Sequence, residues 1–546
     1  MKLAGRAVLS AGMALLVLLG LTGPGSWRAT RAASAAPAAP AAPASRVLLV
    51  GSYHGVPGQY ATIQGAVDAA KPGDWVLVGP GDYKTTSSSS PKGADDTPAA
   101  VLITTSGLHL RGMDRNAVVV DGTKPGTPRC SANGADQNFG PKVSGAGEGL
   151  NGIVVWKADN VWVQNLTACN FLGGSGGDGQ TGNEIWWNGG ADSAKIGGWG
   201  FIGSYLSATS DFYGGESTAA QYGIFSSDWS GGTWDETYAS NFNDSGYYIG
   251  ACQQVCDQVV NRAWAQYNAL GYSGSNSGGN LVVAHSEFDH NEDGFDTNSQ
   301  NGDNPPPQNG ACPGGGISPI THTHSCWVFI DNYVHDNNNP DVPAAGSAAA
   351  GPVGTGLSIS GGRNDTVMDN VFANNGAWGT IFVPYPDSGS PCTGGLSTPV
   401  LCLFDESGDA LIGNTYAHNG FFGNPTNADF GAVNLELSRT DCFGGNVEQG
   451  GGAPSSSPPD LQALYPNCTA TTVPPDLNAL FLAEVACDSE SVSIGPLSGK
   501  STCLPGTHYP RATEVVMHPL PADLPSMPDP CAGVPANPWC PAGQPA

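Results

Sequence analysis

The feature that most constrains the fold of this chain is a repeat of about 23 residues. Residues 259–273, VVNRAWAQYNALGYS, align without a gap with residues 282–296, VVAHSEFDHNEDGFD, so that Asn268 matches Asn291. Weaker copies of the pattern occur at 161–174, 328–338, 366–379 and 410–423. Short strands repeated at this length are typical of a solenoid, in which each repeat forms one coil and contacts only its neighbours.

Two other repeat architectures fit less well. A helical repeat needs apolar residues at 3.6-residue spacing over ten or more positions, and the chain shows no such run. A β-propeller needs blades of about 40 residues built from antiparallel hairpins. We therefore predict a parallel β-helix over residues 46–440, with asparagines stacked at its turns and hydrogen-bonded along its axis.

A short amphipathic helix is expected ahead of the first coils. In YATIQGAVDAAKPGDWVLVGPGDY, residues 60–83, apolar residues recur at i, i+3, i+4 and i+7 from Ile63, and Thr62 is a suitable N-cap. The sequence Pro72-Gly73-Asp74 ends the helix, and a strand is predicted over 75–78. Such a helix can cover the open end of a stack of strands.

The two ends of the chain differ in composition from the repeats. Residues 1–35 combine basic residues, an apolar run at 7–21 and small residues, which predicts a signal peptide, and 36–45 reads as an Ala/Pro linker. Residues 441–546 form a predicted Pro/Cys-rich tail. The even count of 14 cysteines suits disulfides in a secreted protein. The first pairs expected are Cys312 with Cys326 and Cys392 with Cys402, although sequence does not fix connectivity.

The net charge restricts the partners. It is −27 for the whole chain, and loss of the four basic residues in 1–44 lowers it to −31. Nucleic acid is therefore an unsuitable partner, because phosphate binding requires clustered Lys and Arg. We expect no membrane span after removal of the signal peptide, and the oligomeric state stays open. An acidic polysaccharide would be repelled unless a cation bridged the two.

The helix and strand at 60–83, together with the repeat, resemble the N-terminal cap and coils of the pectate-lyase-like right-handed parallel β-helix superfamily. The resemblance covers roughly residues 46–440 and implies a right-handed all-β solenoid with a capping helix. It says little about activity, because that fold hosts lyases, hydrolases, epimerases and non-catalytic adhesins.

The motif EDGFD at 292–296 resembles the acidic signature of the family-nine pectate lyases, where the carboxylates hold calcium. The resemblance implies calcium at Glu292, Asp293 and Asp296, and the position one coil back places Asn268 as a weaker ligand. That family also uses a lysine base. In GTGLSISGG, residues 354–362, Ser358 stands where the lysine is expected, which leaves Arg363 as the nearest strong base.

This departure leaves two functions open. β-Elimination of a uronate needs a cation to neutralise the carboxylate and a base to remove the C5 proton. One prediction is a secreted, carbohydrate-active protein, a calcium-assisted pectate-like lyase with Arg363 as base. The alternative is a non-catalytic extracellular glycan-binding or surface protein on the same scaffold. A glycoside hydrolase using two of the carboxylates is the second enzymatic choice, although the NTD, GHG and RIK motifs of polygalacturonases and the DPHE motif of alginate epimerases are absent.

Three further groups carry weaker signals. His322 and His324 in THTHSC form a possible metal pair or ordinary surface histidines, and Cys252 with Cys256 suggests a disulfide more than zinc. Aromatic residues also crowd the loops from 180 to 240, where they either stack on sugars or cover the solenoid; these are Trp186, Trp187, Trp199, Trp229 and Trp234.

Overall fold

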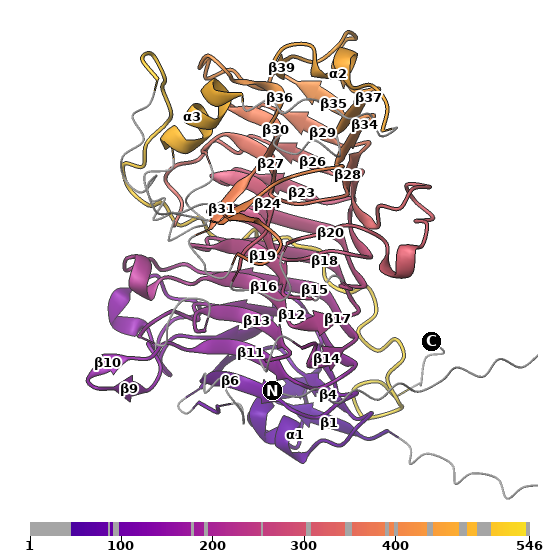
Figure 1. Ribbon diagram of the computed structural model, residues 1–546. Coiled ribbons are helices and arrows are strands. Elements are labelled where there is room, and N and C mark those ends of the chain that lie inside the picture. Colours follow the sequence, from indigo (N-terminus) through magenta and orange to yellow (C-terminus); the bar gives the residue numbers. More distant parts are fainter. Residues whose placement is uncertain are drawn as a thin grey trace, which may run out of the picture. The chain divides into compact units, whose positions relative to one another are not determined.

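Parallel strands wind into a solenoid in a computed structural model of the chain (Figure 1). The structure describes residues 45–85, 88–90, 98–175, 180–190, 195–252, 255–301, 307–343, 352–387, 392–397, 402–433, 441–468, 478–488 and 504–541. Residues from Ser45 onward form one unit. The predicted signal peptide and all but the last residue of the linker lie outside the described residues.

Each full coil contributes one strand to a sheet of 11 strands and two strands, or one long bent strand, to a sheet of 19 strands. We call the larger sheet 1 and the smaller sheet 2. The strands of sheet 2 are β6 (Ala99–Ile103), β11 (Asn151–Trp156), β13 (Asn183–Asn188), β16 (Tyr222–Ser227), β19 (Ser245–Gly250), β21 (Leu270–Ser275), β24 (Asp293–Asn298), β27 (Thr355–Ser360), β30 (Trp378–Val383), β36 (Ala428–Ala432) and β39 (Ser456–Ser457).

Sheet 1 contains two parallel rows. The first row holds β1 (Val47–Val50), β4 (Trp75–Val78), β7 (His109–Gly112), β22 (Leu281–Ala284), β25 (Trp327–Ile330), β28 (Asp365–Met368), β34 (Ala410–Ile412) and β37 (Cys442–Gly444). The second row holds β5 (Gly81–Lys84), β8 (Val118–Asp121), β23 (Glu287–Asp289), β26 (Tyr333–His335), β29 (Val371–Ala373), β35 (Thr415–Ala417) and β38 (Val447–Glu448). Four long strands cross both rows: β12 (Val161–Cys169), β15 (Phe201–Thr209), β18 (Gly232–Ser240) and β20 (Gln258–Gln266).

The bend between the two rows needs a single residue with positive φ. Asn165 in β12 has φ of 57° and Arg262 in β20 has φ of 50°, and in later coils a separate turn residue such as His285 takes this place. Such left-handed residues redirect the chain without breaking the parallel pairing on either side.

The register confirms the predicted stacking of the repeat. Val259 pairs with Val282, and the Asn268 Nδ2 amide donates to Asn291 Oδ1 at 2.9 Å. The same ladder continues through three later coils, by way of Asn337, Asn375 and Asn419. A second ladder joins Asn332, Asn370, Asn414 and Asn446 at another turn. The coils therefore lie directly over one another, and the prediction of a right-handed parallel β-helix is confirmed.

The inside of the solenoid is filled by apolar and aromatic side chains from all three rows of strands. Tyr272 and Phe295, one coil apart, stack with ring centroids 4.0 Å apart, and both are fully buried. The predicted helix is α1 (Ile63–Ala69), with Thr62 Oγ1 accepting from the Gly65 N–H, and its Ile63, Ala66 and Val67 face the core. It covers the first coils, as expected.

Smaller elements project from the coils or end them. Short antiparallel β-ribbons are β2 (Ser52–Tyr53) with β3 (Val56–Pro57), β9 (Lys142–Val143) with β10 (Ala146–Gly147), and β31 (Tyr385–Asp387) and β32 (Leu396–Ser397) with β33 (Cys402–Phe404). A short parallel pair joins two successive coils: β14 (Gly198–Trp199) and β17 (Trp229–Ser230). The short helices are α2 (Leu461–Leu464), α3 (Ala479–Asp488) and the 3₁₀ turns η1 (Gly134–Asp136), η2 (Glu216–Thr218) and η3 (Pro313–Gly315).

The solenoid extends past residue 440, because β37, β38 and β39 pair in parallel with the preceding coil. Six disulfides join described cysteines: 130–169, 252–256, 312–326, 392–402, 442–468 and 531–540. The two pairs expected first are thus confirmed, as is a disulfide between Cys252 and Cys256. Cys503 of the predicted tail lies outside the described residues.

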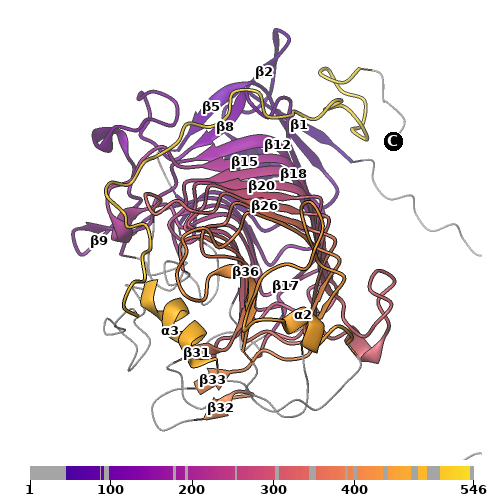
Figure 2. The same cartoon turned by 90° about the horizontal axis from the view of Figure 1, so that it is seen from above.

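The end of the chain, residues 504–541, passes round the outside of the coils (Figure 2), and we call this segment the strap. It makes hydrogen bonds with coil after coil, in descending order along the sequence. The pairs are His508 with Asn424, Val516 with Asp341, His518 with Asn241, Ser526 with Asn165 and Trp539 with Val56. The predicted loop-rich tail is therefore docked over much of the length of the solenoid.

Candidate functional site

The acidic motif lies at the start of β24, on sheet 2. Phe295 points into the core, so alternation along the strand places Asp296 on the outer face of the sheet. Asp296 stands opposite Ser273 of the preceding coil and Ser358 of the following coil. The carboxylate of Asp296 therefore belongs to a row of outward side chains that runs along the solenoid axis.

The serine found in place of the expected lysine is bound to this carboxylate. Ser358 Oγ donates to Asp296 Oδ1 at 2.5 Å, Ser360 Oγ donates to the same oxygen at 2.8 Å, and Asn298 Nδ2 donates to Oδ2 at 2.7 Å. Burial raises the pKa of Asp296 above its ordinary value, and these three hydrogen bonds partly oppose the rise. Ser358 thus orients an acid and supplies no base.

Asp293 is the least satisfied group in the motif. Both of its carboxylate oxygens are buried, and neither has a hydrogen bond of good geometry, although the backbone N–H groups of Phe295 and Gly294 approach the carboxylate and partly lower its pKa. Burial raises the pKa of Asp293 well above its ordinary value, and the nearby carboxylates of Asp296 and Glu292 raise it further. A buried carboxyl group in this state is stabilised either by a proton or by a cation.

The residues present suit a hard cation such as calcium. Calcium takes six to eight oxygen ligands, with carboxylates foremost among them. Asp293 offers two buried oxygens that no side chain binds by a hydrogen bond of good geometry, and Asp296 and Glu292 act on it electrostatically from the same strand end. The fit rests on Asp293 above all, because the oxygens of Asp296 already accept three hydrogen bonds.

The other two predicted site residues are held elsewhere. Asn268 is a rung of the first asparagine ladder: its Oδ1 accepts from the Phe242 N–H at 3.1 Å, and its Nδ2 donates to Asn291. Arg363 lies in the turn after β27, where Nε donates to the Asp405 carbonyl oxygen at 3.2 Å and Nη2 to that of Gly394 at 3.5 Å. The hydrogen bonds of both side chains therefore serve the coils.

An aromatic row continues the line of Asp296 toward the N-terminal coils. Trp186, Phe225 and Tyr248 occupy the matching outward positions of three successive strands, and Tyr248 stands opposite Ser273. The centroids of successive rings are 4.8 Å apart. Their exposed fractions are only 3%, 6% and 8%, because the three rings pack with Val154 and Trp156 in a hydrophobic cluster outside the main core.

Of this row only Trp186 was named from the sequence, because no motif marks Phe225 or Tyr248; at 3% exposure Trp186 covers the outer side of the sheet, the second of the two roles expected for it. Of the other tryptophans, Trp187, Trp229 and Trp234 are fully buried in the core, so the prediction that they stack on sugars is wrong for them. Trp199 in β14 is 54% exposed and keeps that prediction open.

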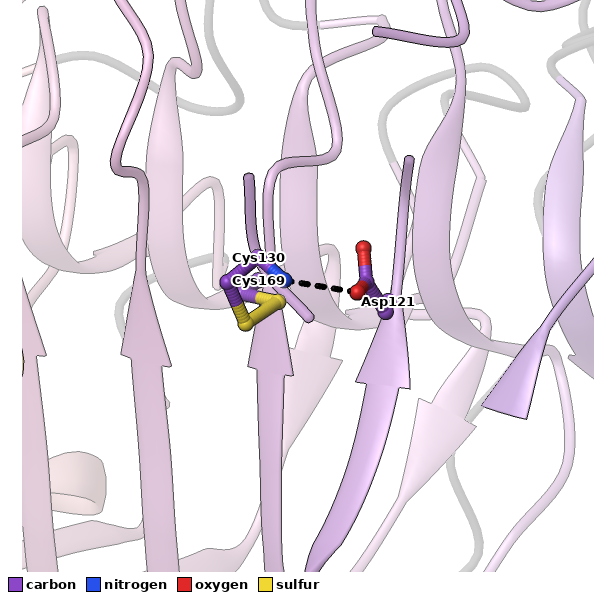
Figure 3. A group of neighbouring side chains, drawn as sticks. All are labelled: Asp121, Cys130 and Cys169. Carbon is purple, nitrogen blue, oxygen red and sulfur yellow. Dashed lines mark hydrogen bonds between the residues drawn. A yellow bond between two sulfur atoms is a disulfide. The ribbon is translucent and has the colours of Figure 1, made fainter. Parts of the chain in front are cut away.

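Two other groups of possible metal ligands differ from the acidic motif. His322 and His324 are both exposed, and the searched, described part of the chain gives them no third ligand. Asp121, Cys130 and Cys169 converge, but the two sulfur atoms form a disulfide and the Cys130 N–H donates to Asp121 at 2.7 Å (Figure 3). A disulfide has no thiolate to offer a metal, so this group is structural.

In the described segments, no helix is both long and apolar enough to cross a bilayer. No protein-family model matches the chain, and no curated protein matches it either. Solved structures similar to it include a mannuronan C-5 epimerase A-module from Azotobacter vinelandii, with 14% identity, a TM-score of 0.42, and coverage of 71% of this chain and 88% of the module.

Two other similar structures bear the names of lyases. A pectate lyase matches with 14% identity and a TM-score of 0.34 over 79% of this chain and 82% of its own. An alginate lyase from a Paenibacillus species matches with 10% identity and a TM-score of 0.33 over 74% and 96%. Identities and scores this low do not indicate the activity of this chain.

Proposed function

We propose that this is a secreted carbohydrate-active protein that binds an acidic extracellular polysaccharide beside sheet 2, through a calcium ion held at the start of β24. The observation that carries the proposal is the buried Asp293 carboxylate, which no side chain binds by a hydrogen bond of good geometry and which interacts electrostatically with Asp296 on the outer face of sheet 2. The hydroxyl and amide groups of Ser273, Ser360 and Asn298 share this face and suit sugar hydroxyls. Disulfides and the predicted signal peptide support export.

Calcium supplies positive charge that neutralises the motif and attracts a uronate carboxylate. The chain itself carries −27, so an acidic glycan would otherwise be repelled. Asp293 and Glu292 would hold the ion, with Asp296 as a third carboxylate.

Binding is favoured over elimination because the described face offers no good base. Ser358 donates to Asp296, and Arg363 donates to backbone carbonyl oxygens. Tyr385 is near enough to Asp296 to be influenced by it, but burial foremost, and then Asp296, raise the pKa of its hydroxyl. A hydroxyl with a raised pKa stays protonated near neutral pH, so it is poorly suited to remove a proton.

Calcium titration of thermal stability tests the metal part. A cation at 100 times its Kd stabilises the folded chain by about 2.7 kcal/mol. Asp293→Asn should abolish the calcium-induced rise in Tm, whereas Asp331→Asn, a change at an exposed aspartate on sheet 1, should preserve it. An equal calcium response in wild type and Asp293→Asn would remove the site.

Affinity electrophoresis in gels containing polygalacturonate, alginate or a neutral glucan tests the ligand. We expect retardation by the acidic polymers only, lost on adding a chelator and lost in Asp293→Asn. Retardation that is equal with and without calcium would contradict the bridging role of the cation.

Calcium-assisted β-elimination is the second candidate, favoured by the buried acidic motif itself. It predicts ultraviolet absorbance from unsaturated uronates when the protein is incubated with these polymers and calcium. New reducing ends without that absorbance would instead indicate hydrolysis by Asp293 and Asp296. Absence of both signals, together with retardation in the gel, supports the binding protein.

A further inference from the structure

A second group of ligating side chains lies on the outer face of the second row of sheet 1. β23 and β26 pair so that Asp289 stands opposite His335, and Phe288 opposite Val334. Phe288 and Val334 are buried in the core, so alternation places Glu287, Asp289 and His335 on the outside. One ligand atom from each of these three residues lies within 4.8 Å of the other two.

We propose that Glu287, Asp289 and His335 bind a first-row divalent cation, with Zn²⁺ as the best match. One imidazole with two carboxylates is a borderline donor set, which suits zinc better than calcium. Ligand atoms about 2.1 Å from a tetrahedral zinc ion lie about 3.4 Å apart. His335 Nε2 and Glu287 Oε1 are already 3.1 Å apart, and the half-exposed side chain of Glu287 can adjust toward Asp289, which is held in place.

Two of the three ligands, His335 and Asp289, are oriented by further side chains. His335 Nδ1 contacts Asp336 Oδ2 at 2.8 Å, which leaves Nε2 directed at the group. A carboxylate on the second ring nitrogen is the usual partner of a metal-binding histidine, because it fixes the ring and raises the basicity of the ligating nitrogen. The Tyr333 ring also stacks on that of His335 at 3.8 Å.

Asp289 is held just as firmly. Its Oδ1 accepts from Trp264 Nε1 at 2.6 Å, and its Oδ2 accepts from Gln266 Nε2 at 2.7 Å. Both donors come from β20, one coil earlier, and His290 Nδ1 also contacts Oδ2. Side chains of the preceding coil therefore hold Asp289 in position. Such fixed geometry distinguishes this group from exposed acidic residues that are merely close to one another.

The group is accessible from one side. The side chain of Asp289 is 3% exposed and that of His335 is 12% exposed, whereas that of Glu287 is 45% exposed. An ion can reach the group past Glu287 without disturbing the core. With three protein ligands, a zinc ion there keeps a coordination position for water or for a further carboxylate.

Isothermal titration of the chelator-treated full chain with ZnCl₂ tests the proposal. We expect one zinc ion per chain, with affinity at least tenfold weaker in His335→Gln and in Glu287→Gln. Glu287→Gln alters a half-exposed side chain, so its result does not depend on refolding of the coil. His285→Gln, a change at an exposed histidine of the same sheet, should bind as wild type does.

Asp293→Asn separates this site from the proposed calcium site. We expect it to bind zinc normally while losing its response to calcium, so either site can fail without the other. Absence of stoichiometric zinc binding by wild type overturns the proposal. Unchanged affinity in both His335→Gln and Glu287→Gln also overturns it, because zinc would then lie elsewhere on the chain.

Discussion

The first asparagine ladder makes the solenoid sensitive to a single change, Asn291→Ala. Asn291 Oδ1 accepts from the backbone N–H of Asn268 at 3.0 Å and from its Nδ2 at 2.9 Å. Asn291 Nδ2 donates to the Ala265 carbonyl oxygen at 3.1 Å and to Asn337 Oδ1 at 3.0 Å. All four partners are buried, so water cannot replace the lost bonds without opening the coil.

The cost follows from these four bonds. A buried hydrogen bond contributes about 1 kcal/mol net, and an orphaned buried partner costs somewhat more, which gives a loss of about 4 kcal/mol. A cooperative unit of about 500 residues has an unfolding entropy of about 1 kcal/mol/K, so Tm should fall by about 4 °C.

Calorimetry of Asn291→Ala beside Asn133→Ala measures this loss. Asn133 is exposed, and its side chain accepts one bond, from the Ala135 N–H, so its variant should melt within about 1 °C of wild type. Equal melting of the two variants would refute the reasoning that the ladder stabilises the stacked coils.

Three further predictions concern the acidic site, a disulfide and the strap. Because burial raises the pKa of Asp293 in the folded chain, folding favours the proton, and without calcium the free energy of unfolding should fall as pH rises above the unfolded value of about 3.9. Thermal melting measured over a range of pH should show a smaller loss of stability with rising pH in Asp293→Asn than in wild type. An equal pH dependence of the two proteins would contradict this prediction. Replacing Cys312 and Cys326 together by alanine opens a loop spanning 14 residues and should cost about 3 kcal/mol in urea unfolding, and a loss below about 1 kcal/mol would contradict the loop-entropy argument. Arg115→Met removes the guanidinium bond to the Pro525 carbonyl oxygen, so limited proteolysis should release the strap faster than in wild type, and unchanged cleavage would show that Arg115 does not anchor it.

The fold was predictable because its determinants recur in the sequence. The match of Asn268 with Asn291 at one coil length predicted both the stacking of the coils and the asparagine ladder. A residue that recurs once per coil lies directly above and below its equivalents in the neighbouring coils, so their side chains can bond to one another. The helix at Ile63–Ala69 was predictable because its cap and its apolar face are local features. The repeat and the local helix pattern can both be recognised in one sequence, without an alignment.

The site was only partly predictable, because the lengths of the coils vary. Trp186, Phe225, Tyr248 and Asp296 form one outward row, yet their spacings in sequence differ with the loops between them. Asn268 was predicted as a calcium ligand because it precedes the acidic motif by one coil. Its side-chain amide instead belongs to the first asparagine ladder. The distance between two residues in the sequence indicates which coil each occupies. Only the strand register and the direction of the side chain show which face of the sheet the residue lies on.

The strap changes how such an array can come apart. In a linear solenoid each coil is supported by two neighbours, and the terminal coils can peel away one at a time. Here the chain returns from Asn424 near one end to Val56 near the other, so early and late coils are fastened by the same segment. Loosening at either end must first free this segment, and we therefore expect the tube to open in one concerted event.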